Sequence, residues 1–176
     1  MHLNNLPAFA YVEDFDAKLI NSLSKNVSLI YRNYKNINIE HILKIKNFCR
    51  RNKKKFYIAN NFKLAIKLNI DGVYIPSFNK NLNVRYLRYK KNFELLGSAH
   101  SLKEIKIKEK QNISKIFLSP LFKTNKSKYF LGIYKFINLK NTTKQNIVCL
   151  GGLNKGNLNK LKLINPYGFA SISLFK

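Results

Sequence analysis

The feature that most constrains this chain is a regular alternation between short apolar runs and longer amphipathic stretches that carry many lysines. Short runs that are almost wholly apolar are typical of strands buried on both faces, as in a parallel sheet. The stretches between them place apolar residues three or four apart, which is typical of helices with one buried face. The strand-like runs comprise residues 9–12, 27–32, 55–60, 71–76, 93–99, 114–120, 146–152 and 167–174.

Eight strand-like runs separated by seven helical stretches predict an α/β fold, a closed (β/α)8 TIM barrel with parallel strands and right-handed crossovers. The helical stretches lie at residues 16–26, 39–53, 62–69, 81–91, 101–110, 133–139 and 158–165. The predicted barrel is minimal, because ~250 residues are usual for this fold and no helical stretch follows the eighth run. An open doubly wound sheet is the alternative, although it usually has fewer strands. No Gly-rich, Ser-rich or Pro-rich linker divides residues 1–176, so we expect a single domain.

The charge of the chain is its most conspicuous compositional property: 33 Lys and Arg face 8 Asp and Glu among 176 residues, a net charge of +25. A basic excess of this size is typical of proteins that bind nucleic acid or an anionic membrane. However, the chain is also rich in Asn and Ile, which share AT-rich codons with Lys, and apart from residues 50–55 the lysines are dispersed. We therefore interpret this basic character as coding bias on solvated faces. We expect small phosphorylated substrates as partners, not nucleic acid or a membrane.

The absence of certain sequence signals indicates where the protein is located and which metal sites are not expected. No apolar stretch reaches the ~18 residues of a membrane span, and the first residues do not resemble a secretory signal, so we expect a cytoplasmic protein. Cys49 and Cys149 stand alone, without a CxxC motif or a histidine pair at zinc spacing. They are therefore expected to be buried reduced thiols, and a zinc site is not expected. The sequence leaves open whether the chain forms a homo-oligomer.

The carboxyl ends of the predicted strands indicate where chemistry would take place, because reactive groups in parallel barrels lie at that end. After the second to eighth runs these positions hold hydroxyls, amides and cations, and no carboxylate. Such groups suit the binding of phosphate or pyrophosphate better than carboxylate acid–base catalysis or an all-carboxylate metal cage. After the seventh run, Gly151 and Gly152 either let backbone amides approach a phosphate or merely turn the chain, and from the sequence the two interpretations are about even.

Several segments resemble, in the same order and spacing, the motifs of the thiamine-phosphate synthase and thiazole tautomerase superfamily. The resemblance covers residues from about Val27 to Phe175. LIYRNY is similar to the strand-two motif, YIANNFKLAIKLNIDGVYIP to the region of strands three and four, and LLGSAHSLKEI to the strand-five motif. IFLSPLFKTNKSK, IVCLGGLN and GFASIS are similar to the motifs of strands six, seven and eight. The common order and spacing, more than any single motif, support the resemblance.

The resemblance implies a reaction and a set of residues. The implied enzyme is a transferase of thiamine biosynthesis that couples hydroxymethylpyrimidine diphosphate to a thiazole phosphate and releases pyrophosphate. The catalytic positions of the family fall on Arg32, Ser98 and Lys128. The positions implied to bind substrate or phosphate are Arg32, Asn60, Ser98, Thr124, Lys128, Gly151, Gly152 and Ser173.

Some of these side chains also have purely structural interpretations. Arg32 could pair with an acid near a strand end, and Ser98 could cap the helix that follows it. His100 is interpreted as a residue of the helix start and not as a general base. Ser101 and Glu104 have the spacing of a capping box, which predicts a helix that begins there.

The chain also departs from the family pattern. Tyr34 replaces the strand-two lysine, and Pro120 stands where the tautomerase has a histidine. Asn60 and Asn79 occupy the positions of the two magnesium-binding aspartates, and an amide can bind Mg²⁺ only through its neutral carbonyl oxygen. The resemblance therefore implies Mg²⁺ as a cofactor, but the two replacements are expected to weaken the affinity of the site for it. The alternative function is a non-synthase relative without metal-dependent chemistry, either tautomerase-like or a binding protein for thiamine or thiazole phosphate.

Overall fold

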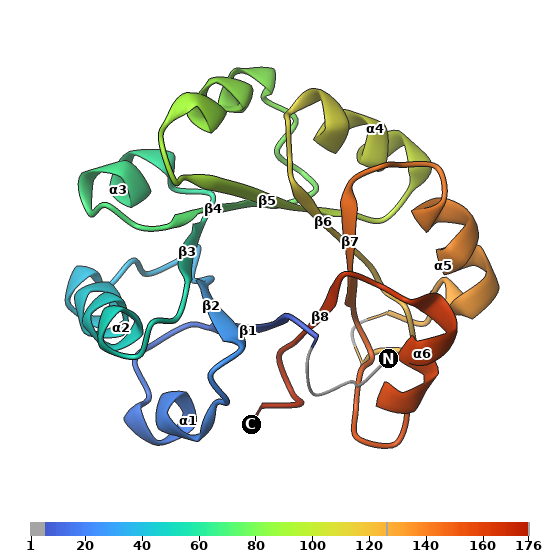
Figure 1. The fold of residues 1–176 in the computed structure, drawn as a ribbon, viewed down its shortest axis with the longest axis horizontal. Helices are drawn as coiled ribbons and strands as arrows, with labels where there is room; N and C mark the ends of the chain where they lie inside the picture. Colours follow the sequence, from blue (N-terminus) through green and yellow to red (C-terminus); the bar gives the residue numbers. More distant parts are fainter. Residues whose placement is uncertain (1–5, 126, 176) are drawn as a thin grey trace.

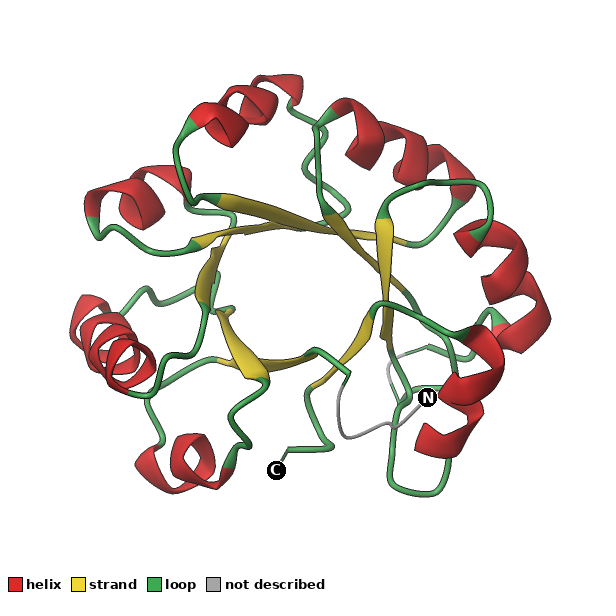
Figure 2. Ribbon diagram, viewed as in Figure 1, coloured by secondary structure: helices red, strands yellow, loops and turns green. Residues whose placement is uncertain are grey.

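The computed structural model describes residues 6–125 and 127–175. Eight parallel strands in chain order form a closed barrel, with helical segments arranged around the outside (Figures 1 and 2). The barrel closes where β8 pairs with β1, with Phe169 opposite Ala8. The predicted (β/α)8 barrel is confirmed, and the open sheet is excluded. The strands are β1 (Ala8–Val12), β2 (Val27–Tyr31), β3 (Phe56–Ala59), β4 (Gly72–Ile75), β5 (Glu94–Ala99), β6 (Lys115–Leu118), β7 (Asn146–Leu150) and β8 (Gly168–Ser171).

The helical segments lie between successive strands, as the alternation predicts. They are α1 (Ala17–Ser22), α2 (Ile39–Arg51), α3 (Phe62–Lys67), the 3₁₀ helix η2 (Leu82–Tyr89), α4 (Leu102–Lys110), α5 (Gly132–Lys140), the 3₁₀ helix η3 (Leu158–Lys160) and α6 (Leu161–Ile164). The first four α-helices begin at side chains that accept a hydrogen bond from the first turn, namely Asp16, Asn38, Asn61 and Ser101. These caps satisfy amide groups that a helix leaves without partners.

Two predicted helices differ from the expectation. Residues 82–89 form a 3₁₀ helix, and the stretch expected at residues 158–165 divides into η3 and α6. After β8, the described residues 172–175 contain no helix, as predicted. Among the residues that the structure describes, no helix is long and apolar enough to cross a membrane. Cys49 and Cys149 are buried free thiols, as expected.

The strands separate two apolar layers. The outer layer fills the space between sheet and helices. The inner layer fills the barrel with side chains that alternate with it along each strand, including the aromatic rings of Tyr11, Tyr74 and Phe117. These three rings pack edge to face, with centroids 5.5 Å apart for Tyr11 and Tyr74 and 5.2 Å apart for Tyr74 and Phe117. The barrel is therefore a packed core, and any ligand site must lie at one of its ends.

Candidate functional site

A cavity of about 560 Å³ lies at the carboxyl end of the strands, among the loops that follow β1, β2, β6, β7 and β8. Five of the residues singled out from the sequence lie together in its wall, although they come from distant parts of the chain. They are Arg32, Thr124, Gly151, Gly152 and Ser173. The remaining lining residues are Glu13, Lys123, Asn125, Leu150, Leu153, Asn154, Ser171 and Ile172.

Arg32 is held at the first position after β2. Its backbone N–H donates to the carbonyl of Val12 at 2.8 Å, and its guanidinium lies over the ring of Tyr11, 4.5 Å from the ring centroid. Among the described residues, no carboxylate lies within ion-pair distance of Arg32. Arg32 therefore does not form the ion pair at a strand end that was its structural interpretation. The guanidinium lies over an aromatic face, and Arg32 is part of the cavity wall, where its N–H donors suit an anionic ligand.

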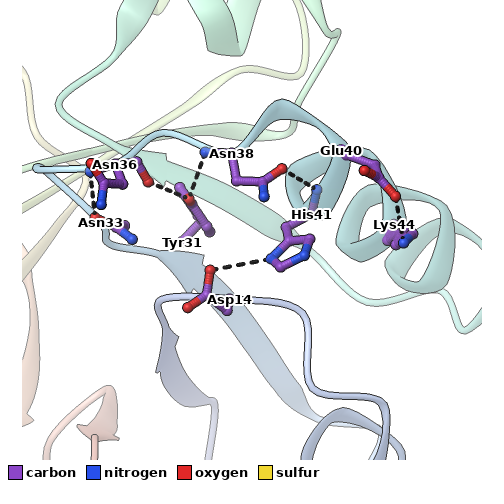
Figure 3. A network of polar contacts seen from close by, with 8 residues as sticks. All are labelled: Asp14, Tyr31, Asn33, Asn36, Asn38, Glu40, His41 and Lys44. Atoms are coloured by element: carbon purple, nitrogen blue, oxygen red, sulfur yellow. Dashed lines mark hydrogen bonds and ion pairs between the residues drawn. The ribbon is translucent and has the colours of Figure 1, made fainter.

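The loop that follows Arg32 is held by its own polar side chains (Figure 3). The Asn33 side chain accepts from the backbone N–H of Asn36 at 3.0 Å, which turns the chain directly after Arg32. The Tyr31 hydroxyl donates to the carbonyl of Asn36, and His41 at the start of α2 contacts Asp14 of the β1–α1 loop at 3.1 Å. The first two bonds hold the loop after β2, and the third ties α2 to the loop after β1, so Arg32 is presented by a fixed backbone.

Tyr34, which replaces the strand-two lysine, lies further along this loop. Its ring packs edge-on against Phe78 from the loop after β4, with centroids 6.0 Å apart; Phe78 is 64% exposed, whereas Tyr34 is 49% exposed. Burial, assisted by the nearby Tyr74, raises the pKa of Tyr34 to about 12 even though Arg32 opposes the shift. Tyr34 is therefore neutral at physiological pH and cannot supply the charge of a lysine.

Polar atoms lie just beneath the mouth of the barrel, on the aromatic floor. Ser98 is buried within β5, and its hydroxyl is close enough to Tyr74 to lower the pKa of that phenol against the larger effect of burial, which raises it. The hydroxyl of Tyr11 is buried and has no hydrogen-bond partner among the described residues. Burial raises the pKa of Tyr11 well above its usual value, so the phenol keeps its proton. The Tyr74 phenol lies close enough to contribute to this shift, although the two hydroxyls do not meet hydrogen-bond geometry.

Gly151 and Gly152 both have backbone conformations that disfavour side chains, with φ of 93° and 70°. A Cβ on Gly151 would lie 2.8 Å from Pro120, and one on Gly152 would lie 2.5 Å from the carbonyl oxygens of Phe122 and Lys123. The two glycines therefore allow the loop after β6 to pack directly on the loop after β7. A turn at residues 155–157 precedes the three-residue η3, so no helix begins directly after the glycine pair.

The loop after β6 contributes Thr124 to the cavity but places Lys128 elsewhere. The Thr124 hydroxyl accepts from the backbone N–H of Ser127 at 3.2 Å, which closes a short turn. Lys128 is exposed and lines an adjoining depression together with Lys123, Thr124 and Asn125. Among the residues of this loop that the structure describes, Lys123 is the cation that lines both spaces.

Asn60 and Asn79 meet at the ends of β3 and β4, as the positions of two ligands of one metal would require. They do so by hydrogen bonding to each other: Nδ2 of Asn79 donates to Oδ1 of Asn60 at 2.7 Å. Oδ1 of Asn79 accepts from the backbone N–H of Asn81 at 3.0 Å. No group of three or more His, Cys, Asp or Glu side chains among the described residues could hold a metal ion. The residues present therefore do not fit Mg²⁺, which requires several oxygen ligands, usually with carboxylates among them.

Behind Asn79 lies a buried lysine that sequence reasoning did not find. The Nζ of Lys108 donates at 2.9 Å to three oxygens, the carbonyls of Pro76 and Asn79 and the side chain of Gln111. Three acceptors match the three hydrogens of an ammonium group, so the charged form is satisfied there. Burial lowers the pKa of Lys108 to about 8, against the opposing effect of the Glu104 carboxylate.

Two expectations from the sequence need correction or refinement, and a third is confirmed. Glu13, directly after β1, lines the cavity, so the strand ends are not free of carboxylates. Ser98 does not cap a helix, because it lies inside β5 and Ser101 caps α4 by accepting from the N–H of Glu104. The carboxylate of Glu104 accepts in turn from the N–H of His100 at 2.6 Å, so His100 belongs to the helix start, as expected.

Comparisons with known proteins agree on one family. The family model described as "Thiamine monophosphate synthase" matches residues 17–175. A putative thiamine-phosphate synthase 2 of Aquifex aeolicus (strain VF5) is 28% identical over 171 residues, which cover 94% of this chain and 91% of that protein. A thiamine-phosphate synthase of Pelagibacter ubique (strain HTCC1062) is 28% identical over 177 residues, which cover 97% of this chain and 83% of that protein.

Solved structures share the fold. A thiamine phosphate pyrophosphorylase from Pyrococcus furiosus superposes with a TM-score of 0.76, covers 97% of this chain and 87% of its own, and is 18% identical. A thiamine phosphate pyrophosphorylase from Bacteroides thetaiotaomicron superposes with a TM-score of 0.63 and 17% identity. The match covers 94% of this chain and 81% of that chain. At these identities the likeness shows a common barrel.

Proposed function

Because this chain belongs to the thiamine monophosphate synthase family, we propose that it couples hydroxymethylpyrimidine diphosphate to a thiazole phosphate and releases pyrophosphate. The observation that carries this proposal is the cavity at the carboxyl end of the strands. It gathers the Arg32 guanidinium, the Lys123 ammonium, the Thr124 hydroxyl and the two glycines in one wall. These groups suit two phosphorylated substrates, because cations and N–H donors stabilise phosphate charge.

In the proposed reaction the C–O bond between the pyrimidine methylene and the diphosphate breaks, and pyrophosphate leaves with the electron pair. The lone pair of the thiazole nitrogen then forms the new C–N bond with the stabilised pyrimidine cation. The residues of this chain have to hold both substrates in line and stabilise the negative charge that grows on the leaving group.

The lining divides naturally between the two substrates. We assign the leaving diphosphate to Arg32, Thr124 and Lys123, with Ser98 beneath it, because these residues supply the charge and the hydroxyls. The thiazole phosphate is assigned to the glycine pair and Ser173 on the side of β7 and β8.

The pyrimidine ring is assigned to the aromatic floor. The rings of Tyr11, Tyr74 and Phe117 are themselves buried in the packed barrel, so the substrate ring would lie above them, at the mouth of the barrel. The buried Tyr11 hydroxyl, which has no partner among the described residues, would donate to a ring nitrogen of the substrate.

A coupling assay with both substrates, detecting thiamine phosphate by its oxidation to a fluorescent product, tests the proposal. Arg32→Met is expected to weaken pyrophosphate binding and to lower kcat/KM by about 10–150-fold, the loss expected for a charge-assisted hydrogen bond. Arg32→Lys should be intermediate, because an ammonium lacks the guanidinium fork. The matched control is Arg50→Met, an exposed arginine on α2.

The outcome also separates the proposal from its alternative. Coupling by the wild-type protein that Arg32→Met impairs and Arg50→Met does not would support the synthase. Tight binding of thiazole phosphate without any coupling would instead favour the non-synthase relative. Equal activity of Arg32→Met and wild type would show that the diphosphate binds elsewhere.

A further inference from the structure

We propose that this chain binds the diphosphate without a divalent cation, because the Asn60–Asn79 pair closes the position that a metal would need and fixed positive charges of the protein replace it. The identity of the diphosphate rests on the proposed function. The closure itself rests on four groups described above, namely the two asparagines, Lys108 and Gln111.

The amide pair presents hydrogen where a cation would need oxygen. The Nδ2 hydrogen of Asn79 lies between the two side chains, directed at Oδ1 of Asn60. Exchanging nitrogen and oxygen in the amides does not change this, since any hydrogen bond between two amides places an N–H between them. Two ligands of one cation must both direct oxygen lone pairs at it. The pair as arranged therefore cannot bind a metal between its side chains.

The pair is held in this arrangement from behind. Lys108 Nζ and Gln111 Nε2 both donate to the carbonyl of Asn79, at 2.9 and 3.0 Å, and Gln111 also donates to the carbonyl of Asn81. The lysine reaches this point through a gap at Gly97, where a Cβ would lie 3.1 Å from the Lys108 Cδ. A buried ammonium thus lies directly against the backbone of Asn79, where its positive charge disfavours a cation at the amide pair.

The carboxylates near the site do not restore a metal position. Asp14 contacts His41, and Glu13 lies after β1, whereas the amide pair follows β3 and β4. Positive charge is available from the protein, because Arg32 and Lys123 line the cavity itself. A guanidinium fork binds two phosphate oxygens at once, as a metal bridging a diphosphate would.

The first experiment measures pyrophosphate binding to the full-length protein by calorimetry, once with excess EDTA and once with millimolar Mg²⁺. We expect the Kd in EDTA to be no more than about threefold weaker than with Mg²⁺, a small free-energy difference. Binding that weakens by about tenfold or more in EDTA would overturn the proposal. If the protein failed to couple the two substrates, this result would still report on the metal.

The second experiment restores the carboxylates. Free Mn²⁺ is measured by electron paramagnetic resonance in the presence of wild type, Asn60→Asp/Asn79→Asp, and the control Asn47→Asp/Asn138→Asp. The control adds the same charge on exposed faces of α2 and α5. We expect Mn²⁺ to bind only the Asn60→Asp/Asn79→Asp variant. Stoichiometric Mn²⁺ binding by the wild type would overturn the proposal. If circular dichroism shows that the double variant does not fold, the single variants and the wild-type result decide.

Discussion

Replacing Gly152 with alanine tests whether the glycine pair serves close packing of two loops or merely turns the chain. The added methyl group would lie 2.5 Å from two backbone carbonyl oxygens of the loop after β6, and the residue has a φ of 70°. Backbone atoms cannot rotate away as the end of a flexible side chain can. The loop that carries Lys123 and Thr124 must therefore shift by close to an ångström before the variant can fold.

The magnitude follows from two costs. Left-handed backbone costs an L-residue about 1–2 kcal/mol, and overpacking of a tight contact costs about 1–3 kcal/mol. The sum is about 2–5 kcal/mol, and at about 3 °C per kcal/mol for a chain of this size the Tm should fall by about 6–15 °C. Gly132 is a matched control, because its φ is 69° but a Cβ there would meet nothing within 4 Å. Gly132→Ala should lower the Tm by only about 3–6 °C.

Differential scanning calorimetry of the two variants, together with thiazole phosphate binding, supplies the readout. Gly152→Ala should lose more thermal stability than Gly132→Ala and should bind the phosphate at least about tenfold more weakly, as misplacement by about 1 Å commonly does. Equal losses of Tm and unchanged binding in both variants would refute the reasoning, because the glycines would then only turn the chain.

Two further predictions concern buried charge. Because the pKa of Lys108 is lowered to about 8 by burial against the opposing Glu104, the unfolded state holds more protons between pH 8 and 10.5. Burial raises the pKa values of Cys49 and Cys149, which lowers stability over the same range, so the effect of Lys108 is read as a difference between variants. The free energy of unfolding of wild type relative to Lys108→Met, measured in urea, should therefore rise by up to about 3 kcal/mol across that window, and an unchanged difference would contradict the prediction. Burial acts to raise the pKa of Glu94, but Lys115 and Lys55 more than offset it and the net shift is downward. Its contribution to stability should be present near neutral pH and be lost as pH falls below the ordinary range of a glutamate; in Glu94→Gln this acid-dependent loss should be smaller, and an unchanged acid transition would contradict the assignment.

The architecture could be predicted from the sequence because its signals repeat. Eight nearly continuous apolar runs separated by amphipathic stretches leave few topologies, and the parallel barrel satisfies all of them. The start of α4 at Ser101, which has strong local chemistry, was also predicted. The 3₁₀ helix at residues 82–89 was not, because hydrophobic spacing over eight residues does not distinguish it from an α-helix.

Two of the residues missed at the site had a signal in the sequence, and the third depends on a contact between distant segments. The position of Ser98 inside the barrel follows from strand alternation with Leu96, and this signal was available in the sequence. Glu13 would also have been found by applying the strand-end rule to the first strand. The buried Lys108 was not predictable from the helix pattern, because a lysine is usually placed in solvent and its gap at Gly97 lies on another element.

The measurement that tests this account most directly is a single turnover with enzyme in excess over both substrates, quenched and assayed for thiamine phosphate, with EDTA or with Mg²⁺. The account predicts about one product per limiting substrate under both conditions, with rates that agree within about threefold. Product in Mg²⁺ alone would contradict the metal-free diphosphate site, and no product under either condition would contradict the proposed synthase.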